Sequence, residues 1–84
     1  MAMKYASTQT FGGKKAVVGL TVILSDASYD GPFPAVIYGV DDTTDLPILT
    51  YNGQTYDSYS FTATITVGEI EGMAAGSWTW PITV

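Results

Sequence analysis

Carboxylates are the side chains of this sequence best suited to chemistry. One short polar segment contains Asp41, Asp42 and Asp45, and hard oxygen ligands at such spacing could hold Ca²⁺. The segment has neither the turn glycine nor the later glutamate of an EF-hand loop. Aspartates in loops usually cap turns or face water. We therefore expect turn residues here and predict no metal site.

A second pair of carboxylates is Glu69 and Glu71, which would share one face of a strand. Paired carboxylates about 5–10 Å apart across a cleft hydrolyse glycosidic bonds, but 84 residues leave little room for a cleft. Histidine and cysteine are absent, so the usual general base and the thiol nucleophile are missing. A serine nucleophile would have to use Lys4, Lys14 or Lys15 as its base. We expect a protein that is not an enzyme and has no cofactor.

Tyrosines form the third group with chemical meaning. Tyr51, Tyr56 and Tyr59 lie around the dipeptide Asn52-Gly53. Rings that are exposed together stack on sugars or on partner proteins. Tyrosine is also a common cross-strand residue whose hydroxyl reaches water, and we prefer this interpretation. The three tyrosines remain a candidate ligand face for an alternative function, a carbohydrate-binding module.

Alternation of side chains predicts the elements that carry these residues. Apolar residues alternate with threonine over residues 61–67 and 78–84, which is typical of half-buried strands. Residues 16–25 form the most hydrophobic predicted strand, and Asn52-Gly53 predicts a type I′ hairpin turn. The only helical candidate is the short stretch 69–75. Many short strands separated by turn residues predict an all-β sandwich or a small barrel, with both tryptophans in its core.

Charge is distributed unevenly along the chain. The net charge is −5, all three lysines lie within the first fifteen residues, and the eight carboxylates follow. An acidic body repels phosphate backbones, so we expect no binding to nucleic acid. The longest apolar run, residues 16–24, is much shorter than the roughly 20 residues of a membrane span. We also expect no signal peptide, because the run is β-branched and interrupted by glycine.

The leading segment allows two interpretations. Residues 1–13 are an N-terminal arm that reaches a neighbouring subunit, or an edge strand of the domain formed by residues 14–84. As an arm, the segment would leave the rest of the chain folded after its deletion. Its partner contacts would come from its basic and aromatic residues and from the two lysines that follow, namely Lys4, Tyr5, Phe11, Lys14 and Lys15.

The order of strands and turns resembles small immunoglobulin-like domains of tailed-phage virion proteins, such as head decoration proteins and tail or baseplate adaptors. The most similar pieces are residues 20–26 and 73–84, where a turn of small residues ending in Gly76 precedes an aromatic strand. The likeness is one of pattern and covers residues 16–84. Unlike antibody domains, the chain has no cysteine for an inter-sheet disulfide.

This resemblance implies an antiparallel immunoglobulin-like β-sandwich of about 6–7 strands. It also implies a structural role in the virion. Our hypothesis is that the chain binds capsid or tail subunits through its N-terminal arm, added as a strand to an exposed sheet edge, and that it self-associates. One further alternative is a cytoplasmic inhibitor whose acidic surface mimics nucleic acid.

Overall fold

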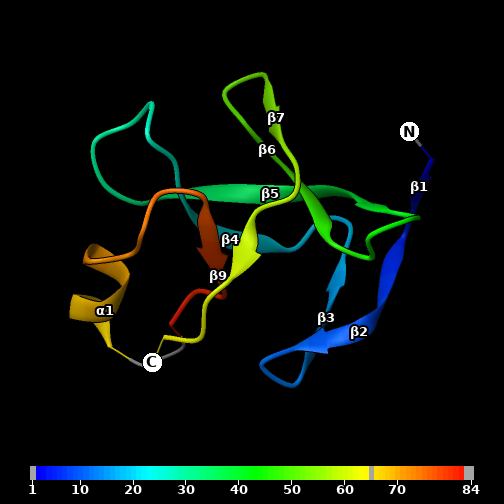
Figure 1. Ribbon diagram of the computed structural model, residues 1–84, viewed down its shortest axis with the longest axis horizontal. Coiled ribbons are helices and arrows are strands. Elements are labelled where there is room, and N and C mark those ends of the chain that lie inside the picture. Colours follow the sequence, from blue (N-terminus) through cyan, green and yellow to red (C-terminus); the bar gives the residue numbers. More distant parts are fainter. Residues whose placement is uncertain (1, 65, 83–84) are drawn as a thin grey trace.

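The computed structural model describes residues 2–64 and 66–82, which form a mostly β chain with one short helix (Figure 1). The expected all-β class is therefore confirmed. The elements within the described residues are β1 (Met3–Lys4), β2 (Ala6–Phe11), β3 (Lys14–Val17), β4 (Thr21–Ser25), β5 (Phe33–Asp41), β6 (Pro47–Tyr51), β7 (Gln54–Tyr56), β8 (Ser60–Phe61), α1 (Val67–Glu71) and β9 (Ser77–Thr79).

The main sheet has the strand order β7-β6-β5-β4-β9-β8, and β1 adds to one end of β5. The hairpin β2–β3 forms a separate two-stranded sheet. The pair β8–β9 is parallel, whereas the other pairs of the main sheet are antiparallel, so the sheet is mixed rather than purely antiparallel. A parallel pair needs a long crossover, which residues 62–76, with α1 among them, supply.

Three strands are shorter than the alternation predicted. The strand expected over 78–84 ends at Thr79 in β9, and residues 80–82 are not part of a strand. Among the described residues of the run 61–67, only Phe61 belongs to a strand. Thr66 instead caps α1, and its side chain accepts a hydrogen bond from the Glu69 N–H. The expected strand 16–25 is divided, since Gly19 at φ 96° turns the chain between β3 and β4. Residues 65, 83 and 84 of the predicted strands lie outside the described residues.

The Asn52-Gly53 turn agrees with its prediction. Both residues have positive φ, at 52° and 78°, and Tyr51 pairs with Gln54 on either side of them. These features define a two-residue hairpin of the type I′ kind. The turn joins β6 to β7, the outermost strand of the sheet at this end.

Strand β5 lies at the centre of the main sheet. It pairs with β4 along one edge, with β6 along the other, and with β1 near its end. Its odd-numbered residues from Phe33 to Ile37 are buried, while Pro34, Val36 and Tyr38 are exposed. The strand therefore has one face in the core and one face outward.

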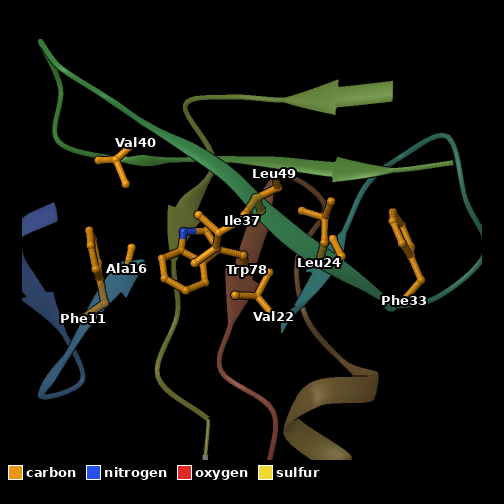
Figure 2. Close-up of a cluster of buried hydrophobic side chains, with 10 residues drawn as sticks. Phe11, Ala16, Val22, Leu24, Phe33, Ile37, Val40, Leu49 and Trp78 are labelled. Carbon is orange, nitrogen blue, oxygen red and sulfur yellow. The ribbon is translucent and has the colours of Figure 1, made fainter. Parts of the chain in front are cut away.

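The core lies between the inward face of the main sheet and the β2–β3 hairpin. Trp78 is fully buried, and its ring centroid lies 5.2 Å from that of Phe11 and 4.9 Å from that of Phe61. Figure 2 shows Trp78 in the middle of the buried cluster, with Phe11 and Phe33 towards its two ends. The expected core position of Trp78 is confirmed, and the half-buried Trp80 packs against it.

The leading segment is folded onto the rest of the chain. Its strand β1 pairs with β5, and the hairpin β2–β3 spans the expected domain boundary with Phe11 opposite Lys14. Phe11 is only 6% exposed and belongs to the core cluster. The segment thus lies in the structure as strands of the domain, and its deletion would remove a core side chain.

We predict that Phe11→Ala lowers the free energy of unfolding by about 3–5 kcal/mol, because the lost ring leaves a cavity beside Trp78. Denaturant unfolding of the full chain measures this loss. The matched control is Tyr5→Ala, whose side chain is 69% exposed, with an expected change of about 0.5 kcal/mol or less. Equal losses in the two variants would contradict a structural role for the leading segment.

Candidate interaction surfaces

Asp41 is the last residue of β5, and Asp42 and Asp45 lie in the tight turn between β5 and β6. The Asp41 carboxylate accepts hydrogen bonds from the backbone N–H groups of Thr43 and Thr44, at 2.7 and 3.1 Å. These bonds lower the pKa of Asp41. Within the described residues, no three acidic, histidine or cysteine side chains come together in a way that could hold a metal ion. Asp41 thus caps this turn in the structure.

Asp45 connects this turn to the leading segment. Its carboxylate forms a 2.7 Å ion pair with Lys4. It also accepts hydrogen bonds from the backbone N–H groups of Thr8 and Gln9, at 2.9 and 2.8 Å. The Thr8 hydroxyl donates a further bond of 2.9 Å. These contacts hold the pKa of Asp45 far below its usual range, with Lys4 as the largest cause and the two N–H donors as the next largest. Because all of these donors belong to the leading segment, the Asp45 carboxylate fixes the position of this segment.

The five residues expected to contact a partner are not gathered on one surface. Lys4 is engaged by Asp45, and Phe11 is in the core. Tyr5 precedes the open end of the β2–β3 hairpin, whereas the exposed Lys14 and Lys15 lie at its turn. The Lys14 ammonium also lies 4.9 Å from the centroid of the Trp80 ring. Tyr5, Lys14 and Lys15 are therefore the exposed residues of this set, and Lys14 also contacts Trp80.

The three candidate ligand tyrosines belong to one aromatic cluster, in which Tyr56 contacts Tyr59, and Phe33 contacts both Tyr51 and Tyr56. Tyr51 also contacts Tyr29. The ring of Tyr51 lies 4.3 Å from that of Phe33, and those of Tyr56 and Tyr59 are 5.8 Å apart in an edge-to-face contact. All three tyrosines are half-buried. Because the rings contact each other, they form an aromatic cluster at one end of the core rather than an open platform.

Hydroxyl groups tie this cluster together. The Tyr59 hydroxyl donates to Asp26, and burial together with this carboxylate raises the pKa of Tyr59 to about 12. The Tyr56 hydroxyl bonds to that of Tyr29, which raises the pKa of Tyr56 to about 12. The part of the chain that the structure describes shows no pocket. The sequence carried no signal for Tyr29 or Asp26 as partners, because both are distant in the chain.

A surface that the sequence did not reveal is the outward side of β5. Val36 is 40% exposed and Tyr38 is 54% exposed. Val36 pairs with Thr21 of β4 and with Thr50 of β6, and Pro34 pairs with Ile23. We call this surface the outer β5 face, and it consists of the outward residues Thr21, Ile23, Pro34, Val36, Tyr38 and Thr50. None of these residues is charged.

The end of β5 extends the same apolar region towards the N-terminus. Met3 of β1, the strand that pairs with the last residues of β5, is 49% exposed, and Tyr5 directly after β1 is 69% exposed. The side chain of Met3 lies over Gly39, and its sulfur is 2.7 Å from the place that a β-carbon would take there. Gly39 thus makes room for Met3, which explains why β1 approaches β5 at this point.

Comparisons of the chain with protein families, with curated proteins and with solved structures find no match. No helix within the described residues is long and apolar enough to cross a membrane. The fold and the surfaces described above are therefore the basis of a functional proposal.

We predict that Asp45→Asn speeds hydrogen exchange at the amides of Thr8 and Gln9 and lowers the thermal midpoint. The low pKa of Asp45 in the folded chain means that its stabilisation is present above about pH 4 and is lost as the pH falls further. The difference in midpoint between wild type and variant should therefore shrink from about pH 7 towards about pH 2. Asp42→Asn, an exposed change in the same turn, is the control. A difference that is constant with pH would contradict this role of the charge.

Proposed function

We propose that this chain is a non-enzymatic structural protein that associates with copies of itself, as a small immunoglobulin-like component of a phage virion. The observation that carries the proposal is the outer β5 face, where exposed apolar side chains gather without any charge. The virion setting rests on the resemblance in strand and turn order. The immunoglobulin-like assignment also draws on the β2–β3 hairpin, which forms a separate two-stranded sheet and contributes Phe11 and Ala16 to the core.

The composition of the outer β5 face is that of a protein–protein contact. The centres of such contacts are depleted in charged residues and enriched in aromatic ones. Val36 and Tyr38 project outward from a central strand, with threonines on the flanking strands. Large apolar side chains that gather in this way on a small protein mark interaction sites more often than isolated ones do. An uncharged sheet face can pack against another sheet face.

The distribution of charge favours a second copy as the occupant. Lys14 and Lys15 are exposed at the hairpin turn, and every carboxylate lies in the rest of the chain. A second copy therefore offers exposed acids, such as Asp30 and Asp57, to the lysines of the first. The uncharged face also lets two chains of net charge −5 approach without bringing carboxylates together. Many weak contacts of this kind add up on a symmetric lattice, where each copy is held by several neighbours.

We predict that Val36→Asp abolishes self-association and leaves the thermal midpoint almost unchanged, because the side chain is exposed and a charge would be buried at the contact. Light scattering over a range of protein concentrations measures the mass of the wild type and of the variant. The matched control is Thr10→Asp, an exposed strand position opposite Lys15 in the hairpin, for which we expect the wild-type mass.

A wild type that stays monomeric at every concentration would contradict self-association. A Val36→Asp variant that still associates would show that the outer β5 face is not the contact. Added salt should weaken the association only in part, since charge attraction supplements the apolar contact. If moderate salt lowered the measured mass all the way to that of the monomer, the contact would lie at the lysines instead.

A further inference from the structure

The turn between β6 and β7 contains the only asparagine of the chain, directly before a glycine. Asn52 and Gly53 are both exposed. A β-carbon built on Gly53 would meet no atom within 4 Å, so the space around this residue is open. Strand β7 has only three residues and pairs with β6 alone. An exposed Asn-Gly dipeptide therefore lies in the turn of a short hairpin at the edge of the main sheet.

We propose that Asn52 is a site of spontaneous deamidation. The Gly53 backbone nitrogen loses its proton to a base in the solvent and attacks Cγ of Asn52, which forms the new C–N bond of a five-membered succinimide. The bond between Cγ and Nδ2 breaks, and Nδ2 gains a proton and leaves as ammonia. Water then opens the ring at one of its two carbonyl carbons. The products are aspartate, or isoaspartate with the main chain running through the former side chain.

The closed turn slows this reaction. At positive φ in a type I′ turn, the Gly53 nitrogen reaches Cγ only after rotation about ψ of Asn52. The ladder pair Tyr51–Gln54 and the 2.9 Å bond from the Thr50 hydroxyl to the Gln54 carbonyl oppose this rotation. Local opening of a short edge strand costs far less free energy than global unfolding. The reaction therefore proceeds through opening of the β6–β7 hairpin.

The two products affect the hairpin differently. Both change the net charge from −5 to −6, because a neutral amide becomes a carboxylate. An Asp-Gly pair still fits a type I′ turn, so the aspartate form keeps the hairpin. Isoaspartate lengthens the main chain of a two-residue loop and shifts β7 against β6. That shift moves Tyr56 away from Phe33 and Tyr59, whose rings it contacts in the native chain.

The test follows the intact mass and the anion-exchange profile of the folded chain in mildly alkaline buffer. We expect a more acidic species whose mass change corresponds to replacement of an amide NH₂ by OH, and peptide mapping should place it at Asn52. The control is Asn52→Gly, which removes the amide and keeps a turn-compatible Gly-Gly pair, and it should stay unchanged. Thr50→Val should react about five-fold faster, the factor that corresponds to the loss of one typical hydrogen bond.

The same chain denatured in urea gives the rate of deamidation when the β6–β7 turn is not formed. A folded wild type that remains unmodified while the denatured chain converts completely would overturn the proposal. Modification that maps to Gln9 or Gln54 would overturn it as well. An unchanged rate in Thr50→Val would overturn the opening step.

Discussion

Burial of Trp78 is the interaction on which the rest of the structure depends. Its ring contacts Phe11 of the leading hairpin, Phe61 of β8 and Trp80 beyond β9. The Trp80 indole N–H also donates a 2.6 Å hydrogen bond to the Phe11 carbonyl. One aromatic side chain therefore connects both ends of a short chain that has no disulfide to hold it. Aromatic rings suit this task because each buries a large apolar area in a small domain.

The two faces of β5 explain how so small a core coexists with an exposed apolar surface. The inward residues of β5 lie in the core, which includes Phe11 and Ala16 of the leading hairpin at one end (Figure 2). At the other end, Tyr29, Tyr51 and Tyr56 pack against Phe33. The outward side of β9 is covered too, since Thr79 is buried and its hydroxyl lies 3.2 Å from that of Thr64. In the described part of the chain, Val36 and Tyr38 remain 40% and 54% exposed. A chain of 84 residues covers one face of its sheet and part of the other, so the remaining face is available for contact with a neighbour.

The candidate surfaces were only partly predictable. Tyr51, Tyr56 and Tyr59 do come together, because the Asn52-Gly53 turn and the strands beside it are local features. Lys4 and Phe11 were expected on one partner surface, but the structure places Phe11 in the core. Alternation along a strand cannot say which end of a hairpin is buried. Asp45 was noticed for its neighbours in sequence, yet its bonds go to residues more than thirty positions away. No local pattern encodes a contact of that range.

The sequence by itself determined the all-β class, the Asn52-Gly53 hairpin turn and the core position of Trp78. Each depends on neighbouring residues, through the period of two along a strand or the tolerance of Asn and Gly for positive φ. Only the tertiary structure decided the parallel pairing of β8 with β9, the attachment of the leading segment by Asp45 and the exposure of the outer β5 face. These features depend on which distant segments pack together, and that is set by the free energy of the whole core rather than by the propensity of any one strand.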